Sequence, residues 1–227
     1  MAWSLTTLKG AIDEYTQNTY WGATDQQDNF IRLAEERINN LVQIDNYNTK
    51  TETGDLAISD SSVTIADSSS APLSAVYFKI RVGADVAATA WEFLLLKDYD
   101  FIQEYAPVDS ATGTPKYYSF YNDASDADKA TFAFGPIASA ACDYEILYYF
   151  TPASIVSTAT TWLGNHAENA LLYACLIEAY TFLKGEPDLL QLYELRFREA
   201  VEALVATEGG VFRNKPRIAR PPAVIPQ

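Results

Sequence analysis

The order of the hydrophobic patterns along the chain limits its fold more than any other feature of the sequence. Apolar residues recur at helical spacing in residues 1–45 and again in residues 157–209. Residues 46–156 are rich in Thr, Ser, Tyr, Phe and Val, with Gly, Pro, Asn and Asp between short runs that are typical of strands. Grouped helices and grouped strands indicate the α+β class. We therefore expect a helical bundle of about four helices with an inserted antiparallel β domain.

Two helices are expected in the first half of the bundle. Ser4 can cap the first helix, whose apolar stripe is Leu5, Leu8, Ile12 and Tyr15. Asp25 and Asp28 place acid at the start of the second helix, whose stripe is Phe30, Leu33, Ala34, Ile38 and Leu41. Glu35 and Glu36 are expected on the outer face of this second helix.

Two further helices are expected after the β domain. Asn165 and Glu168 have the spacing of a capping pair at the start of a helix that runs from Ala167 to Leu183. This helix is apolar on every side, so we expect it to need more cover than one small bundle gives. Pro187 opens the fourth helix, whose seam is Leu190, Tyr193, Phe197, Ala200 and Leu204.

The middle of the chain contains five runs with the composition of strands: Ser62–Ile65, Tyr77–Val82, Lys116–Tyr121, Thr131–Phe134 and Tyr144–Phe150. Trp91–Leu96 is apolar except for Glu92 and is expected to form a largely buried strand. Residues 67–71 and 122–128 are expected to be exposed loops. No clear amphipathic helix interrupts the runs, which favours an antiparallel sheet or a small sandwich.

Charge is distributed unevenly between the body of the chain and its C-terminal segment. The whole chain has a formal net charge of −14, which argues against a protein whose main role is to grip DNA phosphates. Residues 213–227 carry Arg213, Lys215, Arg217 and Arg220 and no carboxylate, so the other 212 residues, with 12 basic and 30 acidic side chains, carry −18. The expected partner of this basic segment is an acidic surface, such as another copy of the chain.

The C-terminal tail, residues 210–227, contains Pro216, Pro221, Pro222 and Pro226 and is expected to be extended. We predict that it forms a binding site for a partner, with these contact residues: Val211, Phe212, Arg213, Lys215, Arg217, Ile218 and Arg220.

Signatures of catalysis are missing from the sequence. His166 is the single histidine, so a histidine pair cannot hold a catalytic metal, and no phosphate-binding glycine loop occurs. Cys142 and Cys175 are expected to be buried structural thiols. We therefore expect no enzyme activity, no cofactor and no resident metal. No apolar run is long enough for a membrane span, and the chain does not open with a secretory signal pattern.

Carboxylates are numerous, and a few have alternative interpretations. Asp98 and Asp100 are expected on one strand face, where they are the best available pair for glycoside chemistry. A loop holds Asp123, Asp126 and Asp128, which we interpret as solvated rather than as a cation site. Glu178 lies among apolar neighbours and is expected to be a bonded acid of the core or of an interface.

The chain resembles the head-to-tail adaptor (connector) proteins of tailed bacteriophages, particularly those of short-tailed phages. The order and spacing of several stretches carry this resemblance: Phe30–Ile38; Gly113–Tyr118; Phe134–Pro136 followed by Tyr144 and Leu147–Tyr149; Thr161–Leu163, Leu171–Ala179 and Phe182–Lys184; and finally Tyr193, Phe197 and Ala200. These stretches run through most of the chain.

The resemblance implies a structural virion protein that forms a ring, usually of twelve copies. The ring joins the portal vertex of the head to the tail and extends the DNA channel, at the head–tail junction of the virion. It implies two partners, the portal protein and a tail nozzle or tail tube protein, with assembly in the host cytoplasm. DNA is expected to pass through without specific binding, because an acidic channel repels it.

A second hypothesis uses the aromatic residues of the middle segment. The chain has 15 Tyr, 11 Phe and 4 Trp. We expect most of them in core and interface packing. The alternative is a glycan-binding or lytic tail component with the tyrosine-rich β domain as a platform for sugars. A DNA-binding packaging factor is a third possibility, but four basic residues on an acidic body support it poorly.

Overall fold

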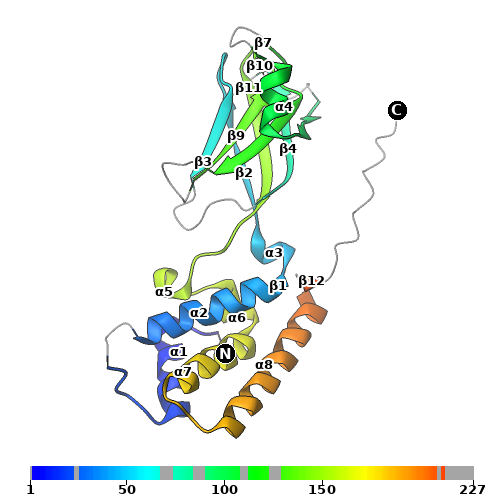
Figure 1. Ribbon diagram of the computed structural model, residues 1–227. Coiled ribbons are helices and arrows are strands. Elements are labelled where there is room, and N and C mark those ends of the chain that lie inside the picture. The colour runs from blue at the N-terminus through cyan, green and yellow to red at the C-terminus, as the bar shows by residue number, and fades with distance from the viewer. Residues whose placement is uncertain are drawn as a thin grey trace. The chain divides into compact units, whose positions relative to one another are not determined.

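The protein is described from a computed structural model, in which residues 2–22, 26–66, 74–83, 90–107, 112–122, 129–208 and 211–212 are placed. The chain divides into two compact units. The helical unit comprises Met1–Tyr47 and Ala153–Gln227, and the β unit comprises Asn48–Pro152. The β domain is thus inserted between two parts of the helical unit, as the chain colours of Figure 1 show.

The helical unit is built around one central helix. Its helices are α1 (Leu5–Thr16), α2 (Gln26–Leu41), α5 (Ile155–Thr158), α6 (Trp162–His166), α7 (Glu168–Phe182) and α8 (Pro187–Glu208), with the short α3 (Asp45–Asn48) leading out of the unit. Helix α7 packs against α1, α2, α6 and α8 (Figure 1). The predicted all-round apolar character of α7 is confirmed. The helices that bury it belong to its own chain, so this one bundle gives more cover than we expected.

Three details of the helix predictions are wrong. Leu33 is 49% exposed, whereas Glu35 is only 6% exposed, because the buried face of α2 is the one that carries Ile31, Ala34 and Ile38. Asn165 caps nothing at the start of α7, where Ala167 occupies the cap position without a side-chain hydrogen bond. The reason is that α6 already contains Asn165, and Thr161 caps α6 instead. Ser4 caps α1 as predicted.

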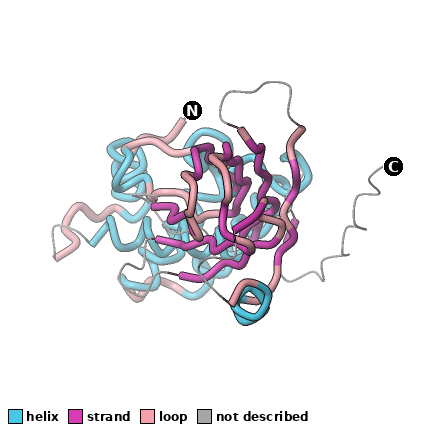
Figure 2. The backbone as a smooth tube through the Cα atoms, turned by 90° about the horizontal axis from the view of Figure 1, so that it is seen from above, coloured by secondary structure: helices cyan, strands magenta, loops and turns pink. Residues whose placement is uncertain are grey.

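Two four-stranded sheets form most of the β unit. The first has the order β2-β11-β4-β5, from β2 (Thr49–Leu56), β11 (Cys142–Tyr149), β4 (Ser74–Val82) and β5 (Glu92–Phe93). The second has the order β3-β9-β8-β6, from β3 (Ser62–Ala66), β9 (Lys129–Gly135), β8 (Tyr117–Asn122) and β6 (Leu95–Leu96). A two-residue pair, β7 (Thr112–Gly113) with β10 (Ile137–Ala138), completes the strands of this unit, which are drawn in magenta in Figure 2.

The strand pairing confirms the α+β prediction. All pairs in the two large sheets are antiparallel except β6 with β8. Strand β11 lies at the centre of its sheet and pairs along eight residues with both neighbours. The sequence did not indicate β2, because an edge strand of mostly polar residues has no apolar period.

Phe78 is the centre of the β-unit core. Its ring lies 5.0–5.8 Å from four other rings, centroid to centroid, which belong to Tyr118, Phe132, Phe134 and Tyr144. These rings come from β4, β8, β9 and β11, so they join the two sheets. Aromatic pairs at such distances stabilise a core beyond the area that they bury.

The prediction of a buried strand at Trp91–Leu96 is wrong. The segment forms β5 at the edge of one sheet and β6 at the edge of the other, and Leu94 between them is buried. Phe93, Leu95 and Leu96 are each about 60% exposed. The segment is apolar although it passes along edges, which is unusual for a surface segment and bears on the interactions of this unit.

An unpredicted helix, α4 (Tyr99–Tyr105), follows β6. Asp98 directly precedes this helix and Asp100 lies in its first turn, so the prediction that they share a strand face is wrong. The helix dipole favours acidic residues in the first turn of a helix, so Asp100 was the sequence signal for this helix. Among the helices of the described residues, none is long and apolar enough to span a membrane.

Candidate assembly interface

The C-terminal tail starts from a fixed point on the helical unit. Val211–Phe212 forms β12, which pairs antiparallel with β1 (Val42–Gln43), with Val42 opposite Phe212. Strand β1 directly follows α2, and β12 comes shortly after α8, so the ladder joins the C-terminal ends of these two helices (Figure 1). Val and Phe favour the extended backbone that this pairing requires. The tail therefore starts beside the end of α2.

The structure brings together only the first part of the predicted tail site. The backbones of Val211 and Phe212 lie in β12. The other predicted contact residues, Arg213, Lys215, Arg217, Ile218 and Arg220, lie outside the described residues.

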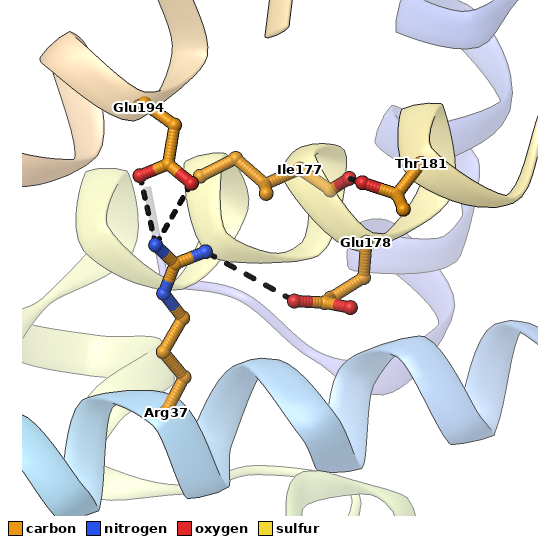
Figure 3. A network of polar contacts seen from close by, with 5 residues as sticks. All are labelled: Arg37, Ile177, Glu178, Thr181 and Glu194. Atoms are coloured by element: carbon orange, nitrogen blue, oxygen red, sulfur yellow. Dashed lines mark hydrogen bonds and ion pairs between the residues drawn. The ribbon is translucent and has the colours of Figure 1, made fainter. Parts of the chain in front are cut away.

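Arg37 of α2 holds α8 in position (Figure 3). Its Nη2 atom donates to both carboxylate oxygens of Glu194, at 2.9 and 2.8 Å. Nη1 lies 4.0 Å from Oε1 of Glu178 on α7, and the guanidinium carbon lies 4.8 Å from the centre of the Phe197 ring. One side chain thus links α2, α7 and α8. Glu178 takes part in this network only through the longer ion-pair contact, and its side chain is 27% exposed, so it is not the acid of the core that its apolar neighbours in the sequence suggested.

Glu35 is a second polar group that fixes α2, and the sequence interpretation missed its burial. The backbone N–H of Ile155 donates to Oε1 of Glu35 at 2.9 Å. Burial raises the pKa of Glu35, and the opposing effects of hydrogen bonds from Ser154 and Ile155 and of the Arg32 charge are smaller. Burial and the nearby Glu35 charge also raise the pKa of Tyr47. The helical spacing of Ile31, Ala34, Ile38 and Val42 was the available signal, since Glu35 lies on that stripe.

The cysteines and the histidine were the remaining candidate residues from the sequence, and each is packed against its neighbours. Cys142 and Cys175 are buried, and burial raises the pKa of both thiols. His166 stacks on Trp162 with ring centroids 4.8 Å apart. Within the described residues no three His, Cys, Asp or Glu side chains form a metal-binding group. The loop with Asp123, Asp126 and Asp128 lies outside the described residues.

Comparison with known protein families decides what kind of protein this is. The family model described as SU10 adaptor protein matches residues 3–220, which span both units and part of the tail. The chain belongs to the SU10 adaptor protein family. No curated protein matches the sequence significantly.

Family membership makes this chain a structural adaptor of bacteriophages. An adaptor of this family interacts with head and tail components of the phage and is a component of the virion neck. The adaptor resemblance of the sequence is confirmed at this level. The family is structural rather than catalytic.

Proposed function

We propose that the SU10-family chain forms a ring, of about twelve copies, that joins the portal vertex of the head of a short-tailed phage to its tail and extends the DNA channel. The observation that carries this proposal is the family match across almost the whole chain. A cyclic arrangement of identical copies is the economical way to continue a symmetric vertex. The adaptor acts without catalysis, is assembled in the host cytoplasm, and contacts the portal protein on one side and a tail nozzle or tail tube protein on the other.

The charge of both units supports passage of DNA without binding. The β unit has 6 basic and 15 acidic residues, a net charge of −9. The helical unit without residues 213–227 has the same numbers and the same net charge. A channel lined by such units repels the phosphate backbone, so the DNA slides rather than adheres.

The tail is the proposed anchor of the adaptor on the portal or on a neighbouring subunit. Arg213, Lys215, Arg217 and Arg220 supply the charge, and Val211, Phe212 and Ile218 supply the apolar contacts. The ladder between β1 and β12 supports this assignment, because it gives the tail a fixed starting point. Charged contacts of this kind weaken as salt screens them.

The tail is tested by a chain that ends at Phe212 and so keeps β12. We expect this variant to retain the secondary structure of the full chain but to lose attachment in co-sedimentation with portal rings. The matched variant keeps the full length and replaces the four basic residues of the tail with Gln. Its attachment should be weakened at low salt, where the natural chain attaches best. Attachment of both variants at the natural level would show that the tail is not the anchor.

Glycan binding remains the second candidate function, and one observation favours it. Tyr99, Tyr105 and Tyr121 of the β unit are 40–45% exposed, and exposed tyrosines can stack on sugar rings. A glycan array probed with the full chain tests this candidate. Specific retention of a glycan that is lost in Tyr105→Ser would support it over simple adaptor function.

A further inference from the structure

The outer side of the second sheet carries two neighbouring groups of aromatic side chains. Tyr117 and Tyr121 of β8 point to this side, opposite to the buried Tyr118, and α4 packs over β8 and β9. Leu95 of the edge strand β6 is the register partner of Tyr117. We name this surface the aromatic face, and it consists of Leu95, Tyr99, Phe101, Tyr105, Tyr117 and Tyr121.

Ring contacts join the aromatic residues of this face in two groups. Tyr99 lies edge-on to Tyr121 with centroids 5.1 Å apart. Phe101, Tyr105 and Tyr117 form a triangle with centroid distances of 5.0–5.8 Å. Ile102 of α4 is buried, and the helix packs on β8 and β9. Leu95, Tyr99, Tyr105 and Tyr121 are 40–60% exposed, whereas Phe101 and Tyr117 are partly buried. Exposed large apolar residues gathered in this way mark an interaction surface.

The charges around the aromatic face define the partner that it fits. Asp98, Asp100 and Glu104 are exposed on and beside α4. Lys97 is directed to the face itself, with its Nζ 5.3 Å from the centre of the Phe101 ring. Exposed rings combined with carboxylates match a segment that is rich in proline and in basic residues, because proline rings pack on aromatic rings and the bases pair with the acids.

Residues 213–227 of this chain have that chemistry. They contain Pro216, Pro221, Pro222 and Pro226 together with four basic residues and no acid. Proline sets an extended backbone in advance, so little conformational entropy is lost on binding. At about 3.1 Å per residue of a polyproline-type helix, the fifteen residues after β12 could span about 45 Å.

We propose that the aromatic face binds residues 213–227 of a second copy of this chain. The proposal rests on the assembly of copies described under the proposed function, and of the two anchors considered there it selects the neighbouring subunit. Each copy then gives its tail to one neighbour and receives a tail from the other. Such a head-to-tail exchange is compatible with a closed ring.

Photo-crosslinking between isotopically distinct copies tests this proposal. One full-length preparation carries p-benzoylphenylalanine in place of Ile218, and a second, ¹⁵N-labelled preparation is unmodified. We expect crosslinks from the unlabelled tail to labelled peptides within residues 95–121. A third preparation with the photoreactive group in place of Tyr20, which is 78% exposed in the helical unit, controls for random capture.

Charge substitutions in the receiving copy sharpen the test. The triple variant Asp98→Asn, Asp100→Asn and Glu104→Gln removes the carboxylates without removing the rings. We expect its yield of crosslinks to fall at least threefold. The matched control is Glu14→Gln, Glu36→Gln and Glu186→Gln, three exposed carboxylates of the helical unit, and its yield should equal that of the natural chain.

Crosslinks of the tail to the helical unit, to its own copy or to the portal alone would overturn the proposal. Glycan binding by the aromatic face, with the tail crosslinked elsewhere, would overturn it as well. Native mass spectrometry of the same mixture with portal rings separates this failure from failure of the proposed function. Rings that form while the tail crosslinks elsewhere contradict only the aromatic-face proposal, whereas chains that never associate contradict both.

Discussion

Glu35 of the helical unit and Glu145 of the β unit are held in opposite ways. In the helical unit, Glu35 is almost fully buried and accepts a backbone hydrogen bond, and burial raises its pKa. In the β unit, Glu145 accepts from Lys79 at 2.8 Å and from the Tyr77 hydroxyl at 2.7 Å, and these bonds lower its pKa. Burial in the helical unit thus disfavours the charged form of Glu35, whereas the hydrogen bonds in the β unit favour the charged form of Glu145.

The units also differ in how they use their apolar residues. The helical unit closes its core around α7, with Ala170, Leu171, Leu176 and Ala179 almost inaccessible to solvent. The β unit has a compact ring cluster around Phe78. Both units leave large apolar side chains exposed, but those of the β unit include Tyr99 and Tyr105, which lie in ring contacts with their neighbours. The ring contacts among exposed side chains of the β unit agree with the partner-binding surface proposed there, whereas the helical unit holds the start of the tail. Each prediction below probes one side of this comparison.

The largest effect is expected from Phe78→Ala. Removing this ring empties the centre of the β-unit core, which should destabilise the unit by about 3–5 kcal/mol. Amide hydrogen exchange by mass spectrometry should show lost protection in the strands of the β unit, with the helices of the other unit unaffected. The control is Phe93→Ala, a ring that is 61% exposed and should change protection little. Equal loss in both units would mean that the two units do not unfold separately.

Arg37→Met should have the next largest effect, on the helical unit. It removes the bonds to Glu194, the longer contact with Glu178 and the stacking on Phe197, and we expect a loss of about 1–2 kcal/mol. Urea unfolding followed by circular dichroism measures this loss. The matched control is Arg196→Met, whose partner Glu199 is as exposed as Arg196 itself, so its loss should be below about 0.5 kcal/mol. Similar losses in the two variants would contradict the bridging role of Arg37.

Glu35→Gln should stabilise the helical unit at neutral pH, by roughly 1 kcal/mol. The folded pKa of Glu35 lies above its ordinary value of 4.5, so the folded unit binds this proton more tightly than the unfolded chain. Its contribution to stability is therefore greatest below about pH 4.5 and falls as the pH rises through the raised pKa. The gain in the variant should shrink as the pH is lowered from 7 toward 4.5. The matched control is Glu36→Gln, which replaces an exposed carboxylate of the same helix and should not give this gain in stability at pH 7.

The smallest effect, of the opposite sign, is expected from Glu145→Gln. The folded pKa of Glu145 lies below 4.5, so its stabilising contribution is present above that pH and is lost as the pH falls through the lowered pKa. The variant should lose roughly 0.5 kcal/mol at pH 7 and match the natural chain in strong acid. Hydrogen exchange in β4 and β11 measures this. A variant that is more stable than the natural chain at pH 7 would show that the contacts with Lys79 and Tyr77 do not stabilise the β unit.

Much of the architecture was predictable because it depends on local periodicity. Helices α1, α2, α7 and α8 follow from the spacing of apolar residues, and five of the strands follow from the composition of short runs. The capping pair at Asn165 and the buried strand at Trp91–Leu96 were wrong for one reason, since each depends on a neighbouring element that the sequence does not reveal. Helix α6 already includes Asn165, and the two sheet edges divide the apolar run into β5 and β6.

The candidate interface was less predictable than the fold. The basic and proline-rich composition of the tail indicates a binding segment, but composition does not show that Val211 and Phe212 pair with β1. The aromatic face depends on the rotation of α4 and on the register of β8 with β9, which place Tyr99 beside Tyr121 and Phe101 beside Tyr117. The positions of these four residues in the sequence do not show which of their rings lie side by side.

Native mass spectrometry of the full chain with the portal ring of the same virus tests the central claim most directly. A ring adaptor should load onto the portal in a fixed, closed stoichiometry of about one copy per portal subunit, and the load should fall as salt is raised. A chain that remains monomeric and does not associate with the portal at low salt would contradict the account.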